Sequence, residues 1–118
     1  MQYVYSEPSG YGFRDVNGHH GKFFGTKSPN TNHLIIECDD KLTVSLIQND
    51  CEFDYYILEG EGYFVFNDEK QKVKQGDLVV VPPGTKYSFG GKLKMLLINT
   101  PHWSQDQETI VPTNPSRQ

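Results

Sequence analysis

Short apolar runs alternate with turn signals along the second half of the chain, from Tyr55 to Pro101. The runs have the length of strands and read YYIL, YFVF, LVVV, KYSF and LKMLLI. The turn signals between them are Glu59–Gly62, Asn67–Asp68, Gly76–Asp77, Pro82–Gly84 and Gly90–Gly91. Strands of about four to eight residues separated by such signals are typical of a β-sandwich or barrel. The sequence therefore predicts an all-β fold that turns at each of these positions.

Two segments of this region are similar to the two motifs of the cupin superfamily. They are YYILEGEG and KQGDLVVVPPGTKY, and the resemblance runs from about Leu42 to Ile98. It implies a double-stranded β-helix, a small jelly-roll barrel. It also implies a metal site, because in this family the first motif usually carries two histidines and a glutamate and the second motif a further histidine.

This chain departs from the family at each metal-ligand position. Alternation from Leu42 to Gln48 places the even-numbered residues inside the barrel. Counted from Gly60 and Gly76, the ligand positions fall on Leu46, Gln48, Phe53 and Tyr87. A shift by one residue gives Ile47, Asn49, Glu52 and Tyr87, which is no better. Because divalent transition metals need imidazole, thiolate or carboxylate donors, we expect a barrel with no metal and no other cofactor.

Length and charge bound the domain organisation and the partners. With 118 residues there is room for one core. We expect a single barrel over residues 1–100, with an N-terminal strand and loop region, and a polar tail over residues 101–118. The net charge of −4 argues against nucleic-acid binding. We find no secretory signal and no segment of transmembrane length, so we expect a cytoplasmic protein without a membrane partner.

Two further features bear on assembly and redox state. Cys38 and Cys51 are too few and too far apart for a metal-binding pair or a disulfide scaffold. Tyr3–Tyr5 predicts a short edge strand, which needs cover from the barrel or from a neighbouring chain. Because such N-terminal strands often build dimers in cupin-like proteins, we expect a homodimer.

The same alternation predicts which side chains surround a ligand. Phe53 and Tyr55 should point inward, and Tyr87 and Phe89 should share one face of a later strand. We therefore expect a small molecule, such as a sugar or an aromatic acid, to contact Gln48, Phe53, Tyr55, Tyr87 and Phe89. Aromatic side chains that simply fill a small barrel are the alternative. Binding is preferred because buried amide and hydroxyl groups need partners.

The histidines give no metal-binding spacing. Neighbouring residues of a strand point to opposite faces, so His19 and His20 are expected to be a solvated loop pair. His33 is expected at the surface or at a subunit contact, and it reaches the barrel mouth only if the parity of its strand is reversed. Glu52 and Asp54 flank the family's glutamate position and are expected to be solvated.

Three functions remain open. The preferred one is a metal-free cupin that binds a small molecule as a sensor, carrier or accessory protein. The second is a metal-independent isomerase or epimerase of a sugar or nucleotide sugar, with Tyr87 or Tyr55 as the acid and His33 or Glu52 as the base.

Other residues bear on the second and third functions. Arg14 is the only arginine before the tail. A substrate with a pyrophosphate group would need more arginines at the barrel mouth, so this shortage counts against the second function. The third function is a metalloenzyme with relocated ligands, such as His33 with Glu52 or His19.

Overall fold

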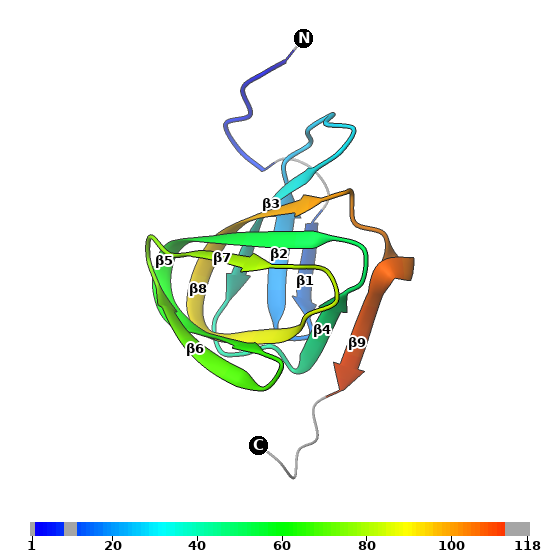
Figure 1. Cartoon of the computed structure of the whole chain (residues 1–118). Coiled ribbons are helices and arrows are strands. Elements are labelled where there is room, and N and C mark those ends of the chain that lie inside the picture. Colours follow the sequence, from blue (N-terminus) through cyan, green and yellow to red (C-terminus); the bar gives the residue numbers. More distant parts are fainter. Residues whose placement is uncertain (1, 9–11, 113–118) are drawn as a thin grey trace.

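A computed structural model describes residues 2–8 and 12–112 of the chain (Figure 1). Within these residues the secondary structure consists of strands and one short 3-10 turn, as the all-β prediction requires. The strands are β1 (Gly12–Val16), β2 (His19–Phe23), β3 (Asn32–Cys38), β4 (Val44–Gln48), β5 (Glu52–Phe66), β6 (Glu69–Lys74), β7 (Leu78–Val81), β8 (Lys86–Thr100) and β9 (Glu108–Pro112), with the 3-10 turn at Gln105–Gln107.

Two long strands, β5 and β8, carry the chain through both layers of the curled antiparallel sheet (Figure 1). The first part of β8 pairs with β4, where Tyr87 lies opposite Leu46. Its last part pairs with β3, where Leu97 lies opposite Leu34. β5 follows β8 along nearly its whole length, with β6 and β7 on its other side. The result is the predicted jelly-roll barrel, whose interior lies between the layers.

Two of the predicted turns do not reverse the chain. At Glu59–Gly62 and Gly90–Gly91 the strands β5 and β8 continue and bend together. The bend uses left-handed backbone, with φ of 94° at Gly60 and 103° at Gly91. A Cβ on Gly60 would lie 1.9 Å from the carbonyl oxygen of Lys92, so only glycine allows this close approach. These signals therefore mark barrel corners.

Alternation of apolar and polar residues predicts buried faces for β3, β4 and the first part of β5, and the structure confirms them. Leu34, Ile36 and Cys38 are buried in β3, Leu46 and Gln48 in β4, and Phe53, Tyr55 and Ile57 in β5. The continuous apolar run LVVV predicts that β7 is buried on both faces, and this prediction is wrong. Leu78 is 63% and Val80 48% exposed, while Val79 and Val81 are buried. β7 pairs with β5 alone and lies at a sheet edge. Its alternate side chains are exposed because an antiparallel sheet has only one face against the interior.

The ends of the chain differ from the sequence expectation. Part of the predicted polar tail is a strand, because Glu108–Pro112 forms β9 and pairs with β4. Residues 113–118 lie outside the described residues. Tyr3–Tyr5 forms no strand, and Tyr3 and Val4 are 82% and 76% exposed. Ser9 and Gly10 lie outside the described residues, and the homodimer stays a prediction.

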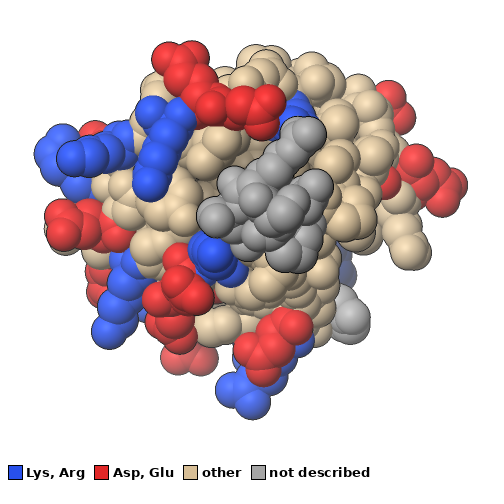
Figure 2. All heavy atoms as spheres, turned by 90° about the horizontal axis from the view of Figure 1, so that it is seen from below, with Lys and Arg blue, Asp and Glu red and all other residues tan. Residues whose placement is uncertain are grey.

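Charged side chains of both signs are interspersed over the face shown in Figure 2. This pattern agrees with the modest net charge of −4. Within residues 2–8 and 12–112, no helix is long and apolar enough to cross a bilayer.

Candidate functional site

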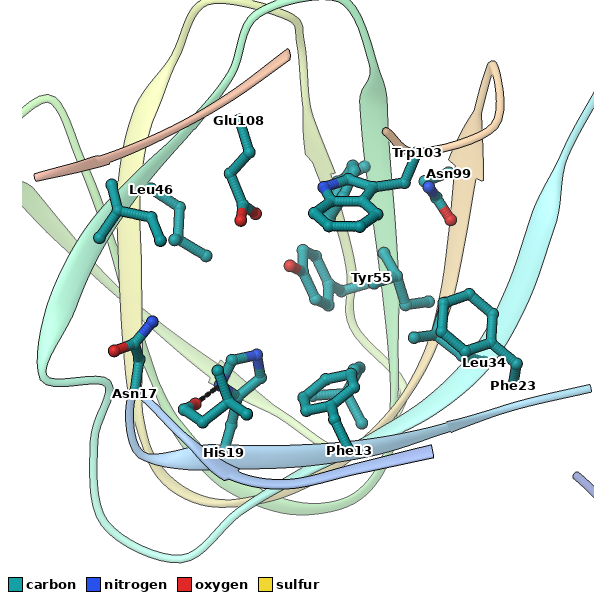
Figure 3. Close-up of a pocket in the computed structure, with 15 residues that line it drawn as sticks. Phe13, Asn17, His19, Phe23, Leu34, Leu46, Tyr55, Asn99, Trp103 and Glu108 are labelled. Atoms are coloured by element: carbon teal, nitrogen blue, oxygen red, sulfur yellow. Dashed lines mark hydrogen bonds between the residues drawn. The ribbon is translucent and has the colours of Figure 1, made fainter. Parts of the chain in front are cut away.

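A cavity of about 270 Å³ lies between the two layers of the barrel (Figure 3). Its wall is mostly apolar and is built by Phe13, Val16, Phe23, Leu34, Ile36, Leu46, Phe53, Leu97, Trp103 and Ile110. Five polar side chains also line it: Asn17, His19, Tyr55, Asn99 and Glu108. The volume is close to the lower end of small-molecule sites, which begin at about 300 Å³.

His19 enters the cavity from the start of β2, just after the Asn17–Gly18 turn (Figure 3). Its Nδ1 lies 2.5 Å from the carbonyl oxygen of Val16. A carbonyl can only accept, so Nδ1 carries the proton and Nε2 of the neutral ring has a free lone pair. Burial lowers the pKa of His19, which keeps the ring neutral at physiological pH. His19 is therefore equipped to act as a base.

Glu108 extends its carboxylate into the same cavity from β9 (Figure 3). Its Oε2 accepts a hydrogen bond of 2.7 Å from Nε2 of Gln48, which is fully buried in β4. The pairing of β9 with β4 brings the two residues together, because Gln48 lies opposite Glu108 in the register. The carboxylate is thereby held in one position.

Tyr55 is the polar group of the deeper wall, and its hydroxyl oxygen lies 2.8 Å from that of Tyr87. Both rings are at most 2% exposed and pack among Phe53, Phe64 and Phe89. Burial raises the pKa of Tyr55 well above its usual value, and it raises the pKa of Tyr87 as well. Both hydroxyls therefore keep their protons and are available as hydrogen-bond donors or general acids.

Asn99 and Trp103 form the side of the cavity opposite Leu46 (Figure 3). Oδ1 of Asn32 accepts a hydrogen bond of 2.8 Å from the backbone N–H of Trp103 and another of 3.3 Å from Nδ2 of Asn99. These bonds fix the backbone of the segment that follows β8, and the Trp103 ring lines the cavity. Trp103 adds a broad aromatic surface to the wall.

The structure gives each predicted ligand residue a clear place. Phe53 and Tyr55 line the cavity. Gln48, Tyr87 and Phe89 lie buried behind that wall, where Gln48 and Tyr87 contact the groups that do face the cavity. Tyr87 and Gln48 therefore do not contact a ligand themselves. They position the side chains that do, Tyr55 and Glu108, through hydrogen bonds.

The predicted bases do not reach the cavity. His33 lies on the outward face of β3, in a surface groove, and its Nδ1 is 3.3 Å from Oγ1 of Thr26. Glu52 is exposed at the start of β5. Beside it, burial and the contact with Glu52 raise the pKa of Asp54. The parity of β3 is not reversed, so His33 remains outside.

Two polar residues of the cavity, His19 and Glu108, were not expected there from the sequence. His19 is half-buried and its ring faces the cavity, whereas His20 points outward and its Nε2 lies 2.8 Å from Oε2 of Glu37. The Asn17–Gly18 hairpin signal was available, and alternation from His19 through Gly21 to Phe23 places these residues on one face. Glu108 had no comparable signal, because its strand is short and polar.

The donor set does not fit a metal ion. The family's ligand positions carry Leu46, Gln48, Phe53 and Tyr87, of which two have no donor atom. Among the residues the structure describes, no group of three or more His, Cys, Asp or Glu side chains could hold a metal ion. The relocated set of His33 with Glu52 or His19 is not brought together.

Comparisons with known proteins agree with this fold. Residues 50–99 match the family model described as Cupin domain. A 61-residue stretch is 36% identical to the uncharacterized protein MJ1618 of Methanocaldococcus jannaschii, covering 48% of this chain and 49% of that protein. The chain therefore spans about half the length of this curated relative.

Solved structures extend the likeness to the whole chain. Streptomyces Pac13, in a histidine-to-glutamine variant with uridine, superposes with a TM-score of 0.88 at 22% identity, covering 99% of this chain and 98% of that one. Pac13 itself, a unique nucleoside dehydratase, gives the same TM-score at 21% identity over 100% and 98% of the two chains. KdgF from a Halomonas species gives 0.72 at 14% identity over 90% and 98%. At these identities the likeness shows the fold.

Proposed function

We propose that this chain, a member of the cupin superfamily, is a metal-independent acid–base enzyme that acts on a nucleoside-sized substrate. One observation carries the proposal: the Nε2 lone pair of His19, the carboxylate of Glu108 and the hydroxyl of Tyr55 converge on one aromatic-walled cavity. The proposal shares metal-independent acid–base chemistry with the second of the three functions expected from the sequence, but it has different bases and a nucleoside in place of the sugar or nucleotide sugar.

The chemistry that these groups support is proton abstraction next to a carbonyl group. Nε2 of His19 takes a proton from the carbon beside the carbonyl, and the hydroxyl of Tyr55 hydrogen-bonds the carbonyl oxygen as it becomes negative. If a hydroxyl stands on the next carbon, the electron pair forms a C=C bond and the C–O bond breaks. The departing oxygen takes a proton from the His19 imidazolium, so water leaves and the histidine is neutral again. Such a step is a dehydration.

Several features favour a neutral nucleoside as the substrate. Trp103 and Phe53 offer aromatic faces on which a base can stack. Asn17 and Glu108 offer polar groups to ribose hydroxyls. None of the described residues that line the cavity is a lysine or an arginine, so this lining offers no cationic side chain to bind a phosphate group.

The structural neighbour supports the same substrate class. Pac13 is a nucleoside dehydratase, and its histidine-to-glutamine and tyrosine-to-phenylalanine variants are known with uridine. Here His19 comes from β2, ahead of the residues that match the cupin family model. Its assignment as the base therefore rests on the geometry of this chain.

The experiment has a binding stage and a reaction stage. Uridine, cytidine, a nucleotide sugar and an aromatic acid are titrated by calorimetry, and we expect a nucleoside to bind. A uridine oxidised to a carbonyl in its sugar is then incubated with the protein in D₂O. We expect deuterium beside the carbonyl by NMR, and loss of water by mass spectrometry where a hydroxyl stands on the next carbon.

Matched variants connect the reaction to the cavity. His19→Gln should lose turnover by about 100-fold, within the range for a general base, while His20→Gln should retain it, because His20 points outward. Tyr55→Phe removes the hydroxyl group that lines the cavity. Its control is Tyr56→Phe, which removes a hydroxyl group from an exposed ring on the outer face. Tight nucleoside binding without deuterium exchange would instead support the sensor or carrier function. An equal effect of His19→Gln and His20→Gln would refute His19 as the base.

A further inference from the structure

Gln107 lies at the end of the 3-10 turn and is 4% exposed. The backbone N–H of Asp50 donates to its Oε1 at 3.1 Å. A backbone N–H can only donate, so this contact identifies the oxygen of the Gln107 amide and turns its Nε2 the other way. Nε2 then donates to Oε1 of Gln48 at 2.6 Å. The orientation of the Gln107 amide is therefore set by the backbone.

Gln107 on one side and Glu108 on the other agree on the orientation of Gln48. Because Oε1 of Gln48 accepts from Gln107, its Nε2 faces the opposite side and donates. One hydrogen bond of 2.7 Å goes to Oε2 of Glu108, and a longer one of 3.5 Å goes to the hydroxyl oxygen of Tyr87. Gln48 is fully buried, so water does not compete for these groups.

The direction continues to the cavity through the two tyrosines. Tyr87 accepts from Gln48, so its own proton needs another acceptor. Among the described residues, the acceptor that the structure offers is the hydroxyl oxygen of Tyr55 at 2.8 Å. With Tyr87 donating to it, Tyr55 has its proton free for the cavity that it lines.

We infer that Gln107 is a positioning residue that sets the direction of this hydrogen-bond chain, so that a ligand meets Tyr55 as a proton donor and Glu108 as an acceptor. The inference rests on the proposed function for what the chain is used for. It restricts the ligand to molecules that place a carbonyl oxygen at Tyr55 and a hydroxyl group at Glu108. It also explains how two buried tyrosines, whose hydroxyls alone have no preferred direction, give a defined acid.

A purely structural role for Gln107 makes a different prediction. The backbone of Gln107 already anchors β9, because its carbonyl oxygen accepts from the backbone N–H of Asn49 at 3.0 Å and from Nδ2 of Asn49 at 2.8 Å. These bonds do not use the Gln107 side chain. A side-chain variant therefore leaves this anchor in place. Gln107→Glu also keeps an oxygen that can accept from the backbone N–H of Asp50, whereas Gln107→Met loses that contact together with the bond to Gln48.

Neutron diffraction on crystals of the full chain exchanged in D₂O tests the direction without any substrate. We expect the Tyr87 deuteron between the two tyrosine oxygens and the Tyr55 deuteron directed into the cavity. A Tyr55 deuteron that points at Tyr87 would overturn the inference. This result does not depend on turnover, so it separates failure of the inference from failure of the proposed function.

Kinetics with the carbonyl-bearing uridine test the consequence. In Gln107→Glu an ionised carboxylate cannot donate to Gln48, so two carboxylates compete for the Gln48 amide NH₂ group. When that group turns to position 107, it no longer donates toward Tyr87, and Tyr55 presents a lone pair to the cavity. We expect kcat to fall about 100-fold with little change in KM, as for a lost oxyanion donor. The ratio of variant to wild-type kcat should rise as pH falls, because the protonated carboxyl donates again. Gln107→Met should be impaired at every pH.

The control is Gln105→Glu, which adds the same charge at an exposed position of the same turn. We expect it to match the wild type throughout. Wild-type kcat in Gln107→Met, with no pH-dependent ratio in Gln107→Glu, would overturn the inference and leave Gln107 a structural residue.

Discussion

The hydroxyl oxygens of Tyr55 and Tyr87 lie 2.8 Å apart inside the barrel, one ring lining the cavity and the other behind it. Tyr87 stands at a position where the cupin family usually carries a metal-binding histidine. In this chain that position supports another polar side chain, and the cavity keeps its polar groups without the family's metal ligands.

Tyr87→Phe tests how much this contact stabilises the protein. The substitution leaves the Tyr55 hydroxyl without its buried partner, so we expect a loss of about 1–2 kcal/mol in the free energy of unfolding. Urea denaturation followed by fluorescence measures it. Tyr56→Phe, which changes a 43% exposed ring, should change stability by less than about 0.5 kcal/mol. Equal effects of the two variants would contradict this account.

His19 should make stability depend on pH. Burial lowers its pKa in the folded state below the ordinary value of 6.5, so the unfolded chain binds more protons near and below pH 6.5. This contribution to stability is complete above pH 6.5 and is lost as pH falls through the folded-state pKa. Denaturation curves from pH 5 to 8 should show a smaller slope with pH in His19→Gln than in the wild type. The same slope in both proteins would count against a lowered pKa of the half-buried His19 ring.

Alanine substitutions at Gly60 and Gly76 distinguish the cost of backbone strain from the cost of steric overlap. Both have φ near 94°, but a Cβ on Gly60 would meet the carbonyl of Lys92, whereas a Cβ on Gly76 meets nothing within 4 Å. We expect Gly76→Ala to cost about 1–2 kcal/mol from strain alone. Gly60→Ala should cost at least about 2 kcal/mol more, because two strands must separate at the corner. Thermal unfolding of the two variants measures the difference, and similar midpoints would argue against a close-packed corner.

Cys38 and Cys51 should be unreactive in the folded protein. Both are buried, and burial raises the pKa of each thiol, so little thiolate is present at neutral pH. Titration with a chromogenic disulfide reagent at pH 8 should be slow in buffer and rapid in denaturant. Rapid modification of either thiol in buffer would show that its surroundings open readily.

Local patterns predicted most of the framework. The alternation of Leu42 to Gln48 and of Phe53 to Ile57 gave the buried faces, because side chains of a strand alternate whatever lies around them. The glycines of the two corners mark interruptions of the strand pattern, and local sequence predicts that the chain reverses there, whereas β5 and β8 continue. Their role depends on a partner strand about 30 residues away, which local sequence does not describe.

The sequence by itself determined that the chain is all-β and which faces most of its strands bury. Its resemblance to the cupin motifs places Leu46, Gln48, Phe53 and Tyr87 where that family usually has metal donors. The tertiary structure decided which groups meet in the cavity. It brings His19 in from β2 and Glu108 from β9, and it leaves His33 and Glu52 outside. The reason is physical: the period of a strand is a local property, whereas a site is assembled by pairings such as that of Gln48 with Glu108, which no local pattern specifies.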